Sequence, residues 1–370
     1  MARCRRKRRS STRKSRKAKK ARKSRVSRPQ RASYHHGLRD AIAAVLPGQF
    51  FSRWKVRAGI QWLPQRIFWL AVMMAWGVDQ TFEAQFDTCR AVLRALFPSW
   101  SLGTTYTGWY EAQRKWIAPL GAAVAKRMRQ QLRSRAGKHW QREGWCAFAV
   151  DGSRIECPRT AANEKALGCA GRTKTGPQLF LTTLQHMGTG VPWDFRIGPG
   201  TASERRHLED MLPALPRQSL VVADAGFTGY DLYRRLLAAN QHFLLRVGAT
   251  VRLLRKLGDV EEHDDWVYLW PDKRRDQPPV KLRLLQRRQG RKTMYLVTDV
   301  LDKPSLSARR AFILYEMRWG VELFYRSFKQ TLGHCRMRSR SPEAARCELT
   351  WAVLGLWLLE WMSVVAISAH

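Results

Sequence analysis

The protein has 370 residues, 45% of them hydrophobic, which excludes a wholly disordered chain and allows about two or three folded domains. Its formal net charge at pH 7 is +38, far more than solubility requires, so we expect a polyanionic partner. Nucleic acid is the favoured polyanion, and an anionic membrane surface is the weaker alternative.

Residues 1–33 are predicted to form a disordered basic tail. About half of the positions up to Arg31 are Lys or Arg, and no acid precedes Asp40. Such a segment cannot bury enough apolar surface to order itself. It is either an electrostatic DNA arm, a nuclear signal if the source is a eukaryote, or a translated stretch without a role.

Residues 34–140 are predicted to be mostly helical. Apolar residues recur at helical spacing in 60–78 and 82–97, with breaks at Pro64 and Pro98. Trp and Arg are interleaved throughout the region. This pattern suits contacts with a DNA backbone, and it equally suits a small helical core with a basic rim.

Neither apolar run in the sequence predicts a membrane span. Residues 67–78 are too few to cross a bilayer, and 349–370 carries Glu360, a carboxylate that is costly in lipid. A buried helix is the better interpretation, so no membrane partner is expected.

The seven cysteines are dispersed and form no CxxC pair, which is typical of reduced thiols in a cytoplasmic protein. His334 and Cys335 alone do not predict a metal site.

From residue 141 to 248 the pattern changes to alternating strands and helices, which predicts an α/β core with a mixed sheet. Two of the predicted strands end in a carboxylate, Asp151 and Asp224. The expected elements are a strand over 145–152, a hairpin over 178–198, a helix over 203–215, a strand over 219–227, a helix over 230–240 and a strand over 242–247.

Residues 249–300 are charged, with short strand-like pieces, and are predicted to be a small β-rich insertion. Residues 301–370 return to a helical pattern. If 315–329 is one helix, its turn of about 100° per residue places four polar side chains on one stripe and an apolar set opposite. The four polar residues are Tyr315, Arg318, Glu322 and Lys329.

Asp151, Asp224 and Glu322 together suggest a metal centre. Strand-end carboxylates gather at the edge of an open α/β sheet, where sites usually form. Three carboxylates without matching His or Cys suit Mg²⁺ or Mn²⁺, and two such ions can support phosphodiester chemistry. Each acid also has a plainer explanation, since Asp151 precedes Gly in a turn-like pair, Asp224 could cap a helix, and Glu322 could pair with Arg318.

Tyr315, Arg318, Glu322 and Lys329 match the Tyr-x2-Arg-x3-Glu-x6-Lys signature of DDE transposases of the insertion sequence 4 family. Over about 145–365 the sequence resembles that family. Further matches are VDGSRIECPRTAANEKALG (150–168), SERRHL (203–208), DAGF (224–227) and FLLRV (243–247).

The resemblance implies a ribonuclease-H-like catalytic core over 141–248 and 301–370, with 249–300 as its β-rich insertion and 34–140 as a DNA-end-binding region. It implies that Asp151, Asp224 and Glu322 bind two Mg²⁺ or Mn²⁺ ions. Phosphates of the element end would be contacted by the signature residues Tyr315, Arg318 and Lys329. Further DNA contacts would come from Arg246 and from a base stacked on Trp266 or Trp270.

Cut-and-paste transposition is therefore the expected function, with double-stranded element ends and target DNA as partners and a homodimer pairing two ends. The family commonly has Arg after the second Asp, where this chain has Ala225, so one phosphate contact is lost or supplied elsewhere. Two alternatives stay open. One is a ribonuclease-H-like nuclease or resolvase that does not join ends, and the other is a DNA-binding relic without catalysis.

Overall fold

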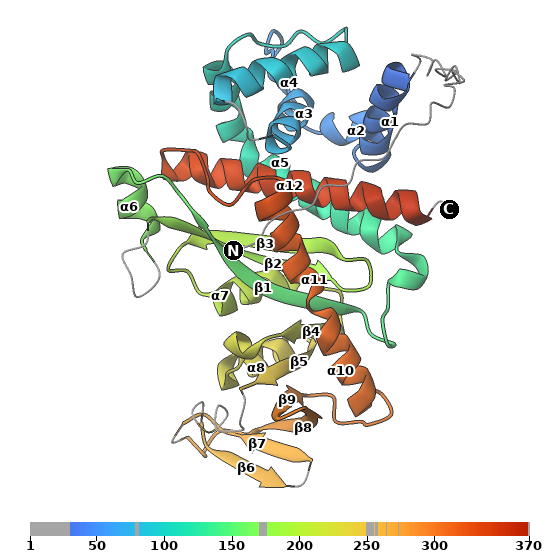
Figure 1. Cartoon of the computed structure of the whole chain (residues 1–370), viewed down its shortest axis with the longest axis vertical. Helices are drawn as coiled ribbons and strands as arrows, with labels where there is room; N and C mark the ends of the chain where they lie inside the picture. Colours follow the sequence, from blue (N-terminus) through green and yellow to red (C-terminus); the bar gives the residue numbers. More distant parts are fainter. Residues whose placement is uncertain are drawn as a thin grey trace, which may run out of the picture.

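The computed structural model describes residues 30–77, 81–169, 176–248, 255, 258–263, 265–272 and 274–368. The predicted disordered tail lies outside these residues up to residue 29, and helix α1 begins at Gln30. Helices α1 to α5 form a group above the sheet in Figure 1, and the long helix α12 runs beside α5. The helices of this part are α1 (Gln30–Val45), α2 (Gly48–Phe51), α3 (Pro64–Ala75), α4 (Phe82–Leu96), α5 (Tyr106–Arg135) and α12 (Pro342–Ser368).

One nine-stranded mixed sheet has the strand order β3-β2-β1-β4-β5-β9-β8-β7-β6 (Figure 1). Strands β1, β4 and β5 are parallel, and all other pairings are antiparallel. The first five strands are β1 (Ala147–Glu156), β2 (Gln178–His186), β3 (Val191–Pro199), β4 (Leu220–Ala223) and β5 (His242–Val247).

The remaining strands are formed by the region predicted to be a β-rich insertion. They are β6 (Val260–His263), β7 (Trp266–Leu269), β8 (Val280–Gln289) and β9 (Lys292–Thr298). Strand β9 pairs directly with β5, with Leu244 opposite Thr298, so these strands extend the central sheet instead of forming a second one. They make up the end of the molecule farthest from helices α1 to α5 (Figure 1).

Helices cover both faces of the central strands, which explains why β4 is apolar at every position. On one face, Ala149 and Val222 pack with residues of α10 (Ala308–Met317) and α11 (Gly320–Arg326). On the other face, Val150 and Val221 pack with α7 (Glu204–Met211) and α8 (Tyr230–Ala238). A short helix, α6 (Ala161–Leu167), follows β1.

Helix α12 contains a stretch, Pro342–Val365, that is long and apolar enough to cross a membrane by length and composition. In the fold it packs against α3 and α5, and more than half of its most apolar window is buried. Its buried Trp351 and Trp357 belong to the core that also contains the α3 residues Phe68 and Trp69. The apolar residues of α12 are therefore used inside the protein.

Strand β1 differs from the expectation that it ends at Asp151. It continues to Glu156, because β2 pairs with it along its whole length, from Phe148 opposite His186 to Glu156 opposite Gln178. The Asp-Gly pair at 151–152 therefore lies within a strand and forms no turn. The parallel neighbour β4 is much shorter and pairs only with the first residues of β1.

Candidate active site

The strand register places Asp151 and Asp224 side by side. Ala149 is opposite Val222 in the parallel pair, so two residues further along each chain Asp151 is level with Asp224, which follows the last residue of β4. Neighbouring strands are about 4.8 Å apart. Side chains alternate between the two faces of a sheet. Asp151 therefore lies on the same face as Ala149, and Asp224 on the same face as Val222, and both of these residues belong to one core cluster.

That face is the one covered by α11, and α11 carries Glu322. Val321 and Phe324 of this helix are buried against the sheet, which leaves Glu322 partly exposed at the edge of the contact. The sheet and the helix thus bring together the three carboxylates that the sequence singled out. The negative charges of Asp224 and Glu322 both raise the pKa of Asp151.

The segment 315–329 is not the single regular helix that the sequence predicted. Helix α10 ends at Met317, the chain tightens into i→i+3 hydrogen bonds around Arg318 and Trp319, and α11 begins at Gly320. A π-helix, Ser327–Thr331, then follows α11. Despite the break, Tyr315, Arg318 and Glu322 contact one another in turn, and Lys329 contacts β1.

Arg318 is buried, with 7% of its surface exposed, and its Nη2 donates to Oε1 of Glu322 at 3.0 Å. Tyr315 is also buried, at 3% exposure, and lies beneath the Arg318 guanidinium. Lys329, in the π-helix, donates from Nζ to Ser153 Oγ at 2.8 Å. Lys329 therefore ties the helical segment to β1, and Arg318 holds Glu322.

Tyr325 is a site residue that the sequence analysis missed. Its buried hydroxyl lies 2.8 Å from the backbone oxygen of Asp151 and 3.2 Å from Thr183 Oγ1. Since Tyr325 is on α11 one turn after Glu322, this contact fixes the helix that carries one carboxylate to the strand that carries another. The signal was present, because the tyrosine lies within the segment 315–329 that carries the signature.

Glu204 is a second residue that was missed, although SERRHL was noted as a helix start. It is the first residue of α7, and its carboxylate approaches the backbone beside Asp151 and beside Asp224. Oε1 lies 2.7 Å from the position that a Cβ on Gly152 would take, and Oε2 lies 3.6 Å from the equivalent position on Gly226. Glu204 approaches from the face that α7 covers, opposite to α11, and its pKa is raised by Asp151 and Asp224, so four carboxylates lie around the edge of β1 beyond the end of β4.

The electrostatics show an excess of negative charge. Burial, together with Asp224 and Glu322, raises the pKa of Asp151 to about 6, although the Gly152 amide and Arg318 oppose the rise. Burial, Asp151 and Asp224 likewise raise the pKa of Glu204. A cation placed among these groups would favour their charged forms.

The oxygen-only donor set fits a hard divalent cation. In the described part of the chain, however, no group of three His, Cys, Asp or Glu side chains is close enough together to hold an ion as the side chains stand. Oxygens of three of them are engaged elsewhere, Asp151 by the Gly152 amide, Asp224 by the Gly226 amide and Glu322 by Arg318. These side chains would have to rotate away from those partners to converge on an ion.

The other three predicted residues differ in where they lie. Arg246 is exposed on β5 and lies beside Asp224, because Ala223 is opposite Leu245 in the parallel pair and the next residue of each chain is therefore level. Trp266 and Trp270 are at and just after β7, where Lys281 and Arg275 stack on them at 4.7 and 4.8 Å. Strand β7 is four places from β4 in the sheet, on the order of 19 Å at the usual spacing. The structure does not bring the two tryptophans together with the acids.

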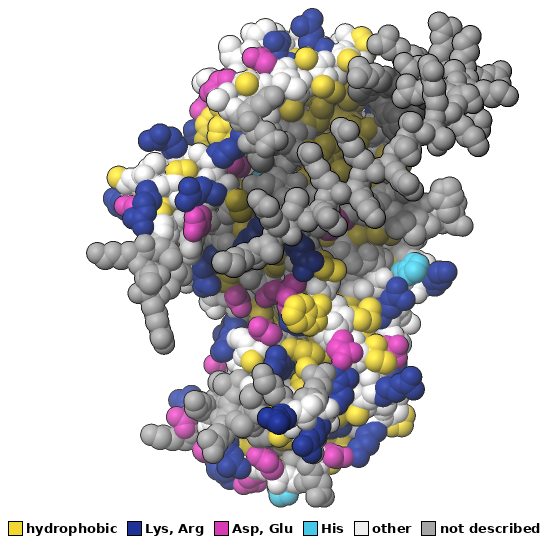
Figure 2. All heavy atoms as spheres, viewed as in Figure 1, with side chains coloured by type: hydrophobic (Ala, Val, Ile, Leu, Met, Phe, Trp, Pro, Cys, Tyr) yellow, Lys and Arg dark blue, Asp and Glu magenta, His cyan; other side chains and the backbone are white. Residues whose placement is uncertain are grey.

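Figure 2 shows acidic side chains near the middle of the face on which α11 lies, with basic side chains around them.

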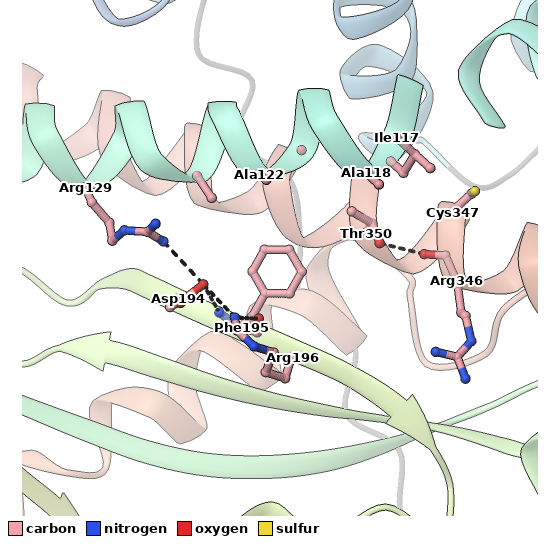
Figure 3. A pocket seen from close by; sticks show the side chains of 12 residues that line it. Ile117, Ala118, Ala122, Arg129, Asp194, Phe195, Arg196, Arg346, Cys347 and Thr350 are labelled. Carbon is pink, nitrogen blue, oxygen red and sulfur yellow. Dashed lines mark hydrogen bonds and ion pairs between the residues drawn. The ribbon is translucent and has the colours of Figure 1, made fainter. Parts of the chain in front are cut away.

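A separate pocket of about 450 Å³ lies between α5, α12 and β3 (Figure 3). Its acid, Asp194, is held between Arg129 and Arg196 at 3.3 and 3.1 Å. None of the residues predicted for the site lines this pocket.

Residues 142–358, more than half of the chain, match the transposase DDE domain family. The chain is also 27% identical, over 242 residues, to the transposase InsG for insertion sequence element IS4 of Escherichia coli (strain K12). That alignment covers 61% of this chain and 54% of the other protein, so the chain spans about half the length of this curated relative.

Two solved structures show a looser likeness. One is a piggyBac transposase synaptic complex with hairpin DNA, with a TM-score of 0.46 and 11% identity over 89% of this chain and 76% of that chain. The other is a pre-cleavage Mos1 transpososome, with a TM-score of 0.20 and 12% identity over 51% of this chain and 60% of that chain. These TM-scores are too low to establish a shared fold.

Proposed function

This chain belongs to the transposase DDE domain family, in its insertion sequence 4 branch, and we propose that it is a metal-dependent transposase that moves an insertion sequence by cut and paste. The observation that carries the proposal is the register of β1 and β4. It sets Asp151 and Asp224 level with each other on the sheet face covered by the helix of Glu322.

Asp151, Asp224 and Glu322 would hold two Mg²⁺ or Mn²⁺ ions. When bound, such ions increase the nucleophilicity of the attacking oxygen and stabilise the leaving one in phosphodiester chemistry. Arg318 holds Glu322 in place and keeps a positive charge beside the site. Lys329, anchored on Ser153, supplies a second positive charge near β1, where a DNA phosphate can enter.

The chemistry would proceed in two in-line displacements. First, a water oxygen attacks a phosphorus atom at the element end, the bond from phosphorus to the 3′ oxygen breaks, and a free 3′-OH is left. Second, that hydroxyl attacks a phosphorus atom of target DNA, which forms a new phosphodiester and releases a target 3′-OH. A hairpin on the element end would be an additional intermediate in some relatives.

Different regions of the chain would have different roles. Strands β1 to β5, in the order 3-2-1-4-5 with β1, β4 and β5 parallel, suit a ribonuclease-H-like core over 141–248 and 301–370. The helices of residues 34–140 would recognise the element ends, and the basic tail would add electrostatic attraction. A homodimer would pair two ends, with the protein acting on bacterial DNA in the cytoplasm.

Strands β6 to β9 would contact DNA beyond the cleavage point. Arg246 is exposed on the strand that joins them to the core, and could bind a phosphate. Trp266 and Trp270 already stack with cationic side chains, so either ring could exchange that contact for an unpaired base. In this arrangement Tyr315, which is buried under Arg318, would reach a phosphate only if the α10–α11 junction opens.

The test uses DNA that carries the ends flanking this gene, incubated with the full chain and Mg²⁺. We expect free 3′ ends and joined products, both lost in Glu322→Gln. The matched control is Glu316→Gln, because Glu316 is an exposed acid on the neighbouring helix α10 that pairs with Arg287 on the surface.

Other outcomes would identify the alternatives. Metal-dependent cleavage without joining would indicate a nuclease or resolvase. DNA binding with no metal-dependent chemistry in either protein would indicate a relic whose basic surface alone remains in use.

A further inference from the structure

We propose that Glu204 is a fourth carboxylate of the catalytic centre and helps Asp151 and Asp224 to hold a divalent cation. This inference rests on the proposed function and goes beyond the three acids Asp151, Asp224 and Glu322.

Two glycines make room for the Glu204 carboxylate. A Cβ on Gly152 would lie 2.7 Å from Oε1, closer than non-bonded carbon and oxygen atoms approach. On the other side, the Cβ position of Gly226 is 3.6 Å from Oε2 and 3.0 Å from Asp224 Oδ1. Glu204 Oε2 and Asp224 Oδ1 are therefore at most 6.6 Å apart, the sum of the two distances. Side-chain rotation would bring both to one ion, whose ligand oxygens lie about 2.1 Å from Mg²⁺.

The start of α7 is fixed to the loop that follows Asp224. Ser203 caps the helix by accepting from the Arg206 amide, and Arg205 Nε donates to the Gly226 carbonyl at 2.8 Å. Both neighbours of Glu204 are thus tied down, one to its own helix and one to the Asp224 loop. The carboxylate is held at a defined place beside the strand ends, as a metal ligand requires.

In the described part of the chain, the Glu204 carboxylate has no hydrogen-bond or ion-pair partner. The cations that face it are Arg154 and Arg205, and their Nε atoms donate instead to the carbonyls of Gly200 and Gly226. A half-buried carboxylate without a partner costs free energy, which a bound cation would recover. A role at the helix N-terminus alone would not require the side chain to fill the space at Gly152.

The experiment measures Mn²⁺ binding to the full chain without DNA, by the electron paramagnetic resonance of free Mn²⁺. We expect Glu204→Gln to weaken binding by about tenfold or more. The control is Glu209→Gln, because Glu209 lies on the same helix but pairs with Arg206 and Arg235, and it should bind Mn²⁺ like the unaltered protein. Unchanged binding in folded Glu204→Gln would overturn the inference.

Asp151→Asn and Asp224→Asn separate this inference from the proposed function. If these two variants lose Mn²⁺ and Glu204→Gln does not, only the role of Glu204 is wrong. If none of the three changes binding, the metal centre itself is wrong. Should Glu204→Gln fail to fold, Glu204→Asp keeps the charge at the helix start while withdrawing the oxygens by one methylene. It should also bind Mn²⁺ more weakly, and equal binding would refute the proposal.

Discussion

Arg318 should stabilise the metal-free protein, and Arg318→Gln should unfold more easily. The guanidinium is almost fully buried, its Nη2 is 3.0 Å from Glu322 Oε1, and its charge opposes the rise in the pKa of Asp151. Removing it leaves two carboxylates facing each other with less compensation. Arg318 therefore acts in the folded protein before any DNA is bound.

The size of the effect follows from the burial of the pair. Breaking a fully buried ion pair costs about 3–5 kcal/mol, and an exposed pair is worth about 0–1 kcal/mol. Here the Arg318 side chain is 8% exposed but Glu322 is 35% exposed, so we expect a loss of about 1–3 kcal/mol. Glu322→Gln should change stability by less than about 1 kcal/mol, because it removes a repulsion with Asp151 together with the ion pair.

The assay is urea unfolding in the presence of a chelator, for both single variants and the double variant. Arg326→Gln is the control, since Arg326 is exposed on the same helix and should change the free energy of unfolding by about 0.5 kcal/mol or less. The double variant should recover part of the loss. The reasoning is refuted if Arg318→Gln unfolds like the control, or if Glu322→Gln is as destabilised as Arg318→Gln.

Three further predictions concern neighbouring features. Burial raises the pKa of Glu360 to about 8. The stability that depends on its neutral form is therefore complete below about pH 4.5, the pKa in the unfolded chain, and is lost as the pH rises through 8. Glu360→Gln should therefore be more stable than the unaltered protein at pH 8 by about 2–4 kcal/mol, with little gain at pH 5, in urea unfolding. Gly152→Ala would put a methyl group 2.7 Å from Glu204 Oε1 and from the Phe180 ring, so it should bind Mn²⁺ more weakly in the resonance titration; equal affinity would contradict the geometry. Tyr325→Phe loses the hydrogen bond to the Asp151 backbone and should cost about 1–2 kcal/mol of unfolding free energy, whereas no loss would mean that water replaces it.

The elements of the core could be predicted from sequence where a local pattern decides the structure. The strands predicted over 219–227 and 242–247 and the hairpin predicted over 178–198 are marked by apolar runs and glycine turns, and the structure has strands there, although β4 ends at Ala223. The end of β1 was not predicted correctly. An Asp-Gly pair favours a turn locally, but the pairing of β2 along the whole of β1 is a long-range effect that no local pattern contains.

The candidate site shows the same limit. Spacing along the chain identified Glu322 and its neighbours, but it could not show the helix break at Arg318 or the π-helix at Lys329, which depend on packing against the sheet. Glu204 was overlooked for a related reason. An acid at the start of a helix is common, and only the glycines at 152 and 226, far away in sequence, show that its carboxylate reaches the other acids.

The most direct test of the metal centre is the DNA cleavage rate of Glu322→Cys in Mg²⁺ and in Mn²⁺. Mg²⁺ takes oxygen ligands and accepts sulfur poorly, whereas Mn²⁺ tolerates it better. If Glu322 contacts the ion, cleavage should be lost in Mg²⁺ and should return in part in Mn²⁺, with no such recovery in Glu322→Ala. Equal loss in both metals, or cleavage that persists in Mg²⁺, would contradict the account.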